Sequence, residues 1–208
     1  MAPILCYVTD RKLLPVPQTE ALLAAVRRAA TAGVDWIQIR EKDLSARAQA
    51  LLARETVASV RGTATRILIN ERLDVALAVG AGGIHLGAES LPVAEVAGWC
   101  AKNAPIFVVG ASCHSLAEAQ LAEQHGANYI VFGPVFSTPS KLAYGPPQGL
   151  GCLEEVCRNL KIPVLAIGGV TLENACECLG VGAAGIAGIR LFQDASDLPA
   201  LILSLRTL

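Results

Sequence analysis

The stretch Asp35-Trp-Ile-Gln-Ile-Arg-Glu-Lys-Asp43 begins with the alternating pattern of a β-strand and ends in a row of polar side chains. Side chains on a strand point alternately to its two faces, so Gln38, Arg40 and, if the strand continues that far, Lys42 share one face. Neighbours in this row lie ~6.6 Å apart, which suits successive oxygens of an extended polyanion such as a diphosphate. Arginine and lysine both bind phosphate well. An edge strand with a solvated polar face is the competing interpretation.

The composition favours a single compact α/β domain over residues 1–208. Apolar residues make up 53% of the chain and aromatic residues only 4%, so the core must consist mainly of Ala, Val, Leu and Ile. Helices that cover buried parallel strands need such residues. The net charge of −1 includes no charged block, which argues against nucleic-acid and membrane partners. No signal-peptide pattern and no apolar run near ~20 residues occurs, so we expect a cytoplasmic protein.

The seven cysteines lack the paired spacing of a zinc site or a redox motif. We therefore expect reduced thiols that pack as small apolar side chains.

The chain repeats one unit, an apolar strand followed by a helix. The expected strands are Ile4–Thr9, the start of the stretch quoted above, Arg66–Ile69, Gly83–Leu86, Ile106–Val109, Tyr129–Phe132, Pro163–Ile167 and Ala184–Ala187. The expected helices are Gln18–Ala32, Leu44–Val60, one that ends at Val79, Leu91–Lys102, Leu116–His125, Leu153–Leu160, Leu172–Leu179 and Leu198–Leu205. This alternation predicts a single parallel (β/α)8 barrel, the TIM barrel. An open doubly wound sheet is the alternative, but no GxGxxG motif follows the first strand.

Polar residues gather after the expected strands, whereas the turns that precede the strands are short and rich in Gly and Ala. In a parallel barrel the functional loops follow the strands and lie at one rim. Two of these loops, at Gly168-Gly169 and Gly188, open helices, where backbone N–H groups bind phosphate. The alternative is that these glycines only form turns.

A long loop, Gly133–Gly151, is rich in Gly, Pro and Ser. Loops of this length in a compact domain are usually functional or disordered. We expect Lys141, near its middle, to be a lid residue that becomes ordered when a diphosphate binds. A flexible insertion is the alternative.

Among the three histidines, His114 is the best candidate for a general acid–base residue, because it follows the fifth expected strand beside Ser112. A bystander role for His114 is the alternative. His85 is expected to orient the rim.

Six segments together resemble the thiamine-phosphate synthase superfamily, which also contains the thiazole tautomerases. They are Ile37-Gln-Ile-Arg-Glu-Lys42, Ile69-Asn-Glu-Arg-Leu-Asp-Val-Ala76, Gly83-Ile-His-Leu-Gly87, Gly133-Pro-Val-Phe136, Thr138-Pro-Ser-Lys141 and Ala166-Ile-Gly-Gly-Val170. The resemblance implies a (β/α)8 barrel. It also implies a Mg²⁺-assisted transferase that joins a hydroxymethylpyrimidine diphosphate to a thiazole phosphate and releases pyrophosphate.

The resemblance further implies roles for individual residues. The pyrimidine diphosphate would be held by Gln38, Arg40, Lys42, Asn70 and Ser112, with Lys141 on its pyrophosphate. The thiazole phosphate would be held by Thr138, Pro139, Ser140, Gly169, Ile189 and Arg190, and Gly168 joins them as part of the expected anion-binding turn. Arg40, Lys42, Lys141 and His114 are the expected catalytic residues.

The metal-binding positions depart from the family pattern. The synthases carry aspartates where this chain has Glu71 and Ser90. A hydroxyl is a poor Mg²⁺ ligand, so we expect Glu71 and the phosphates of the substrate to hold the ion weakly.

Two alternatives to a synthase stay open. One is a thiazole tautomerase that acts on a thiazole phosphate carboxylate, with His114 moving the proton. The other is a phosphate-ligand binding protein without turnover. Gln38, Arg40 and Lys141 favour the synthase, because a tautomerase has no diphosphate to hold. The sequence leaves a homodimer open.

Overall fold

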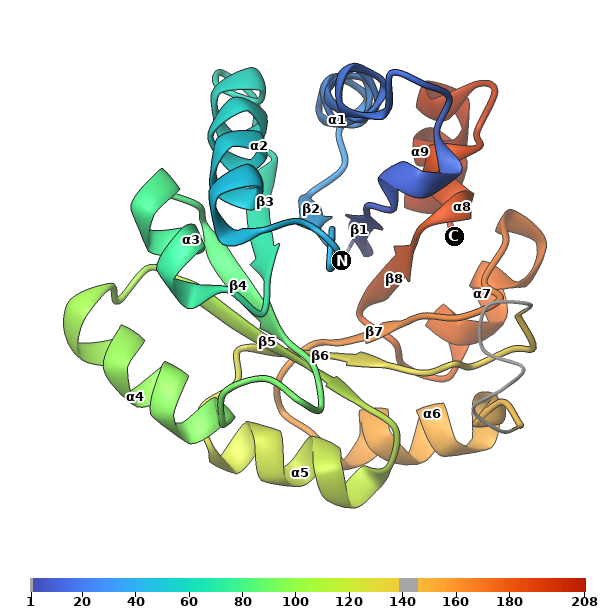
Figure 1. The fold of residues 1–208 in the computed structure, drawn as a ribbon. Helices are drawn as coiled ribbons and strands as arrows, with labels where there is room; N and C mark the ends of the chain where they lie inside the picture. Colours follow the sequence, from blue (N-terminus) through green and yellow to red (C-terminus); the bar gives the residue numbers. More distant parts are fainter. Residues whose placement is uncertain (1, 139–145) are drawn as a thin grey trace.

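Eight parallel strands close into a barrel within residues 2–138 and 146–208, the part of the chain that this computed structural model describes. The strands are β1 (Ile4–Val8), β2 (Trp36–Ile39), β3 (Arg66–Asn70), β4 (Gly83–Leu86), β5 (Val108–Cys113), β6 (Tyr129–Phe132), β7 (Val164–Ala166) and β8 (Gly185–Gly188). Each strand pairs with the next, and β8 pairs with β1 to close the barrel (Figure 1). The predicted (β/α)8 barrel is confirmed.

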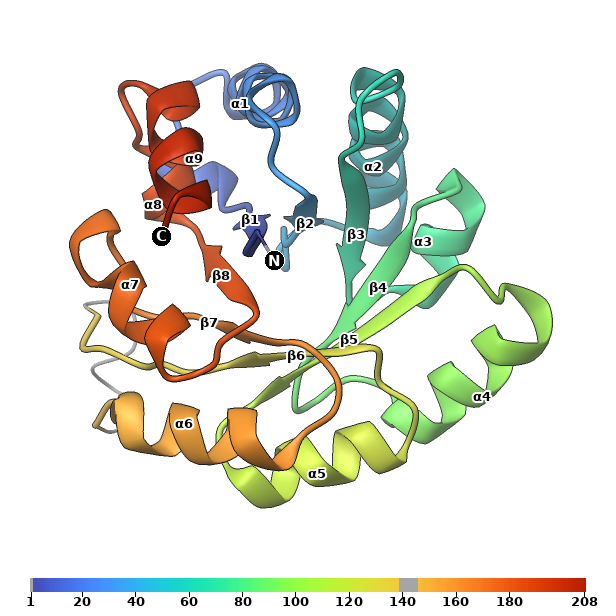
Figure 2. The same ribbon diagram turned by 180° about the vertical axis from the view of Figure 1, so that it is seen from behind.

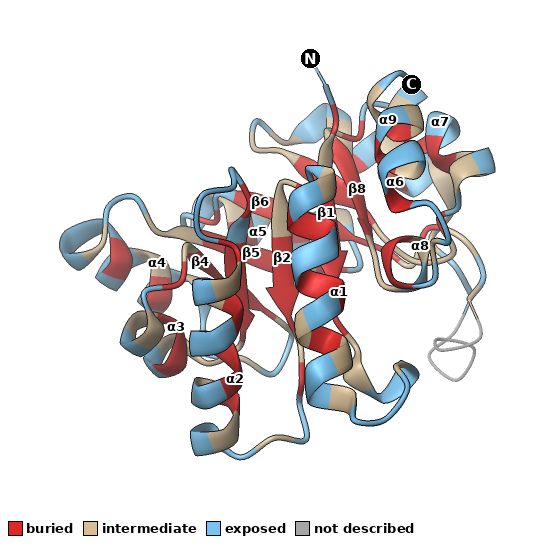
Figure 3. Ribbon diagram, turned by 90° about the horizontal axis from the view of Figure 1, so that it is seen from above, coloured by how far each residue is buried: buried red, intermediate tan, exposed pale blue. Residues whose placement is uncertain are grey.

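Helices surround the strands, as two opposite views of the ribbon show (Figures 1 and 2). They are α1 (Gln18–Ala32), α2 (Ala46–Ser59), α3 (Leu73–Val79), α4 (Val93–Asn103), α5 (Leu116–Gln124), α6 (Gly149–Asn159), α7 (Leu172–Gly180), α8 (Arg190–Gln193) and α9 (Leu198–Arg206), with a short 3₁₀ helix, η1 (Arg11–Leu13), after β1. Their inner faces are buried against the strands and their outer faces are exposed (Figure 3). None of the helices in the described ranges is long and apolar enough to cross a membrane.

The apolar side chains form an outer core between strands and helices and an inner core within the barrel. Ile37 and Ile39 lie in the outer core, as predicted from their alternation with Gln38. The strand neighbours of Gln38 are Val8 and Leu68, and both belong to the inner core. Gln38 therefore faces the barrel interior, on the side predicted for the polar row.

The fifth strand differs from its predicted position. It was expected at Ile106–Val109 but runs from Val108 to Cys113, whereas Ile106 is 89% exposed in the preceding turn. The backbone of this strand is paired on both sides, with β4 and with β6, so the ladder continues through residues of low strand propensity. Ser112 consequently lies within a strand and not in a loop.

Helix α6 was predicted to begin at Leu153 but begins at Gly149. The backbone N–H groups of Gln148 and Gly149 donate to the carbonyls of Pro134 and Val135, at 2.8 and 3.1 Å, and these bonds fix the first turn. The long loop that was expected to extend to Gly151 therefore ends earlier. The seven cysteines are all free thiols, as predicted, but Cys152 and Cys176 are exposed and do not pack as small apolar side chains in the core.

Candidate active site

Two buried amides form a pair at the carboxyl ends of β2 and β3. Gln38 Nε2 donates to Asn70 Oδ1 at 2.8 Å, and the two residues are only 3% and 6% exposed. A buried side-chain amide with one bond made has its remaining donor and acceptor directions fixed. The structure therefore brings together two of the residues that the resemblance assigns to one substrate.

Arg40 directly follows β2, and its backbone N–H donates to Thr9 Oγ1 at 3.0 Å. Its guanidinium has no hydrogen bond or ion pair with any described residue. Burial lowers the pKa of His85 to about 4. The negative charge of Glu71 raises this pKa, and the positive charge of Arg40 lowers it. Arg40 is thus an unpaired cation close to the polar residues of β3 and β4.

Glu41, the next residue in the loop after β2, is only 3% exposed. Glu41 Oε1 accepts a hydrogen bond from Thr9 Oγ1 at 2.7 Å, and both carboxylate oxygens accept from the backbone N–H of Arg11 at 3.2 Å. Burial raises the pKa of Glu41. This residue ties the loop after β1 to the loop after β2 and so holds the backbone of Arg40. Sequence analysis gave Glu41 no role, because an acid between two cations is typical of a solvated loop.

Lys42 lies beyond the end of β2 at Ile39, so the strand does not continue to it. The alternation of a strand therefore does not align the side chain of Lys42 with that of Arg40. Lys42 Nζ instead forms an ion pair with Glu71 Oε1 at 2.8 Å, and Lys42 is about half exposed. This contact places the second cation of the row beside the expected metal position.

Glu71 and Ser90 lie close together above Gly87. Glu71 Oε1 would be 3.1 Å from a Cβ atom on Gly87, and Ser90 Oγ would be 3.8 Å from it. The hydroxyl oxygen of Ser90 accepts the backbone N–H of Gly87 at 2.7 Å. No group of three His, Cys, Asp or Glu side chains that could hold a metal occurs among the described residues. For Mg²⁺ this site offers a single carboxylate, that of Glu71. Phosphate oxygens and water must supply the other ligands.

A buried histidine connects the interior of the barrel to Ser112. His85 Nδ1 lies 2.9 Å from Tyr129 Oη, and His85 Nε2 lies 2.8 Å from Ser112 Oγ. His85 is 2% exposed, Tyr129 is fully buried and Ser112 is half-buried at the end of β5. The expectation that His85 orients the rim matches this geometry, because His85 holds the hydroxyl of a predicted substrate contact.

Sequence analysis did not single out Tyr129 or Gly110. A Cβ atom on Gly110 would lie 2.0 Å from the Tyr129 ring, so only glycine leaves room for the ring beside β5. A glycine within a strand often marks such a close approach, and that was the available signal.

The glycine turn after β7 packs against the segment after β6. Gly168 and Gly169 have φ values of 95° and 67°, and Cβ atoms there would meet Pro134 at 2.5 Å and Ser137 O at 2.6 Å. Glycine is therefore required for the turn whether or not a ligand binds. The backbone N–H of Gly169 has no acceptor among the described residues.

The turn after β8 contains Ile189 and leads into α8, which begins at Arg190. Helix α8 was not predicted, because four residues are too few for a helical periodicity to be recognised. The strand pairing of β7 with β8 brings this turn next to Gly168-Gly169. The structure thus brings two neighbouring turns together, and their role as a phosphate site stays a prediction.

Thr138 is half-buried and is the last described residue before the gap at 139–145, and the described chain resumes at Pro146, ahead of α6. The predicted site residues Pro139, Ser140 and Lys141 lie outside the described residues, and so does the predicted lid.

His114 is exposed, and its ring Nδ1 donates to the carbonyl of Gly133 at the start of the segment after β6. Its backbone N–H donates to Glu118 Oε2 at 2.6 Å. A carbonyl only accepts hydrogen bonds, so the neutral ring carries its proton on Nδ1 and leaves Nε2 as an acceptor. The acid–base role of His114 stays a prediction.

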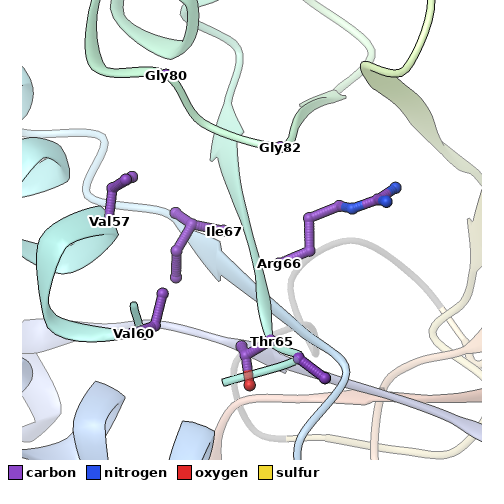
Figure 4. A pocket seen from close by; sticks show the side chains of 8 residues that line it. Val57, Val60, Thr65, Arg66, Ile67, Gly80 and Gly82 are labelled. Carbon is purple, nitrogen blue, oxygen red and sulfur yellow. The ribbon is translucent and has the colours of Figure 1, made fainter. Parts of the chain in front are cut away.

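A shallow pocket lies at the opposite end of the barrel, at the start of β3, and is lined by Val57, Val60, Thr65, Arg66, Gly80 and neighbouring residues (Figure 4). Thr65 Oγ1 already donates to the carbonyl of Val34 at 2.7 Å, and the side chain of Arg66 extends away from Val57 and Val60 (Figure 4). We assign no role to this pocket.

Comparison with known proteins finds relatives that match along most of the chain. The sequence model of the thiamine monophosphate synthase family matches residues 5–192. A putative thiamine-phosphate synthase 2 of Aquifex aeolicus is 42% identical over 92% of this chain and 98% of its own length. A thiamine-phosphate synthase of Syntrophomonas wolfei is 40% identical over 93% of this chain and 90% of its own.

A solved thiamine phosphate pyrophosphorylase from Pyrococcus furiosus superposes with a TM-score of 0.83 at 35% identity, over 98% of this chain and 94% of that one. A 3-hexulose-6-phosphate synthase with a TM-score of 0.70 is only 18% identical and shares the fold alone. The family match, the relatives and this structure agree with the resemblance drawn from the six segments. The chain therefore belongs to the thiamine monophosphate synthase family.

Proposed function

We propose that this protein joins a hydroxymethylpyrimidine diphosphate to a thiazole phosphate, giving thiamine phosphate and pyrophosphate. Membership of the family and the names of its relatives support this reaction. The observation that carries the site assignment is the guanidinium of Arg40, which has no partner among the described residues and whose charge acts on His85, the strand neighbour of Asn70. An unpaired cation in this polar part of the rim is suited to a diphosphate.

The diphosphate would bind across the ends of β2, β3 and β5. Arg40 offers a planar fork of donors to two phosphate oxygens, and Lys42 adds a second positive charge from its pair with Glu71. Ser112 and the Gln38–Asn70 pair would bind the pyrimidine. We keep Lys141, outside the described residues, as a proposed contact to the pyrophosphate.

The thiazole phosphate would bind at the turns after β7 and β8. The N–H groups of Gly168, Gly169 and Ile189 supply donors, and Arg190 supplies a positive charge. Thr138, with Pro139 and Ser140 outside the described residues, would border the same ligand.

The reaction breaks the bond between the pyrimidine methylene carbon and the diphosphate oxygen, and the bonding electron pair leaves with pyrophosphate. The methylene carbon becomes electron-poor, and the lone pair of the thiazole nitrogen forms the new C–N bond. Arg40 and Lys42 stabilise the charge that grows on the departing oxygen, which is the main electrostatic contribution. The phosphate turns hold the thiazole in line for attack. No proton needs to move in this step.

Mg²⁺ fits this site as an ion held mainly by the substrate. Glu71 would be its protein ligand, and Ser90 would contribute little because its oxygen already accepts the Gly87 N–H. When bound, the ion adds positive charge to the diphosphate.

We also propose that the protein acts in the cytoplasm on these small molecules.

The test is direct: incubate the purified protein with both substrates and Mg²⁺ and separate the products by liquid chromatography. Thiamine phosphate and pyrophosphate should appear in equal amounts, and neither should appear when one substrate is omitted. The matched control is Arg40→Ala, which should lose nearly all product. Isomerisation of a thiazole phosphate carboxylate, abolished by His114→Gln, without any thiamine phosphate would instead identify a tautomerase.

A further inference from the structure

Three side chains from β6, β4 and β5 form a continuous hydrogen-bonded chain inside the barrel. Tyr129 Oη lies 2.9 Å from His85 Nδ1, and His85 Nε2 lies 2.8 Å from Ser112 Oγ. Tyr129 is fully buried, whereas Ser112 is half-buried at the rim. The chain therefore runs from the closed interior to the site.

Packing leaves the Tyr129 ring one position. Gly110 pairs with Tyr129 across β5 and β6, and any Cβ there would overlap the ring. On another side the ring centroid of Trp36 lies 4.6 Å from that of Tyr129. The hydroxyl is thus held where it meets His85 Nδ1.

Counting donors and acceptors decides which atom carries each hydrogen. Within residues 2–138 and 146–208, Tyr129 Oη has one hydrogen-bond partner, His85 Nδ1. If Nδ1 carried a proton, the tyrosine hydrogen would be buried without an acceptor, which is costly. If Tyr129 donates to Nδ1, the neutral ring carries its proton on Nε2 and donates it to Ser112 Oγ.

We propose that Tyr129 is a positioning residue that fixes the Nε2–H tautomer of His85 and thereby leaves the hydroxyl hydrogen of Ser112 free to donate to the bound substrate. In the opposite tautomer, Ser112 would donate to His85 and could only accept from the substrate. The acceptor that Ser112 meets is a pyrimidine ring nitrogen or a diphosphate oxygen. The identity of this acceptor rests on the proposed function, whereas the tautomer does not.

The tautomer is measured by nitrogen NMR of the protein labelled with ¹⁵N at its three histidine rings. His114 is an internal reference, because its Nδ1 donates to a carbonyl and its tautomer is the opposite one. His85→Gln and His114→Gln assign the signals. We expect His85 to show a protonated Nε2 and an unprotonated Nδ1. A protonated Nδ1 on His85 in the unaltered protein would overturn the proposal, whatever the protein catalyses.

Tyr129→Phe keeps the ring and removes only the hydroxyl. We expect this variant to populate both His85 tautomers. Tyr7→Phe is the matched control, since Tyr7 is equally buried and its hydroxyl donates to Gln193 Oε1 at 2.8 Å outside the barrel interior. It should leave the His85 signals unchanged. An unchanged single Nε2–H tautomer in Tyr129→Phe would show that Tyr129 does not set it.

Kinetics separate positioning from general damage. Tyr129→Phe should raise the KM for the pyrimidine diphosphate by about tenfold, the effect of one hydrogen bond, and leave the KM for the thiazole phosphate unchanged. In a Ser112→Ala background it should have no further effect on that KM. Equal increases in both KM values, or full additivity with Ser112→Ala, would contradict the proposal. Absence of turnover in the unaltered protein would refute the proposed function, and the NMR result would still decide the tautomer.

Discussion

Lys42 and Glu71 form a 2.8 Å ion pair that joins the loops after β2 and β3 at the rim of the barrel. Glu71 has a φ of 65°, a left-handed conformation that Asp and Asn adopt more readily than Glu. Its carboxylate lies next to Ser90, where the family resemblance implies a second carboxylate. The proposed metal position therefore keeps one acid, Glu71, and that acid is already paired with a cation.

From this geometry we predict weak Mg²⁺ binding by the free protein and turnover that needs unusually high Mg²⁺. Replacing Glu71→Asp together with Ser90→Asp adds a carboxylate and suits the backbone at residue 71. The Mg²⁺ concentration for half-maximal rate should fall by about tenfold or more, as one added charged ligand allows. The rate is measured against Mg²⁺ for parent and double variant. Tight Mg²⁺ binding by the unaltered free protein would refute this argument.

Two glycine substitutions should have opposite effects on stability. Gly110→Ala places a methyl group 2.0 Å from the Tyr129 ring and should destabilise the fold by about 3 kcal/mol, because the barrel interior cannot yield. Gly98→Ala, in the exposed middle of α4 with nothing within 4 Å, should stabilise it by up to about 1 kcal/mol. Thermal unfolding measures both changes. A harmless Gly110→Ala would mean that Tyr129 is not fixed as described.

The buried His85 should make stability depend on pH. Burial lowers its pKa from 6.5 to about 4, so between these values the unfolded chain binds a proton that the folded chain does not. Above about pH 6.5 the lowered pKa of His85 does not change the free energy of unfolding. As the pH falls from 6.5 towards 4, the free energy of unfolding decreases. At pH 5 the loss should be about 2 kcal/mol.

Urea unfolding of the unaltered protein and His85→Gln at pH 7 and pH 5 tests this prediction. The stability difference between the two proteins should shrink by about 2 kcal/mol at the lower pH. His125→Gln, at an exposed position after α5, is the control and should show no such change. A difference that stays constant with pH would rule out the role of His85.

The sequence predicted the barrel because its signal is repeated along the whole chain. Ile37 and Ile39 alternate with Gln38, and the structure confirms both faces of β2. Errors occur where pairing partners override local propensity. Gly110-Ala111-Ser112 looks like a loop in isolation but forms a strand because β4 and β6 bond it on both sides.

The predicted site residues are brought to one rim wherever the structure describes them, since strand ends alone determine that placement. The interactions between them could not be predicted. Whether Glu41 is buried depends on Thr9 and Arg11, about thirty residues earlier in the chain. The contact of Tyr129 with His85 likewise depends on space left by a glycine on another strand. Such contacts arise from tertiary packing, which no local pattern encodes.

Isothermal titration calorimetry of the two substrates against the parent protein and Arg40→Ala tests the central claim, that the end of β2 holds the diphosphate. Arg66→Ala is the matched control, because Arg66 is an exposed arginine at the start of β3, on the opposite end of the barrel. We predict that Arg40→Ala weakens binding of the pyrimidine diphosphate by about 10- to 100-fold and changes thiazole phosphate binding by less than about twofold, with Arg66→Ala altering neither. Equal losses for both ligands in Arg40→Ala would contradict the claim.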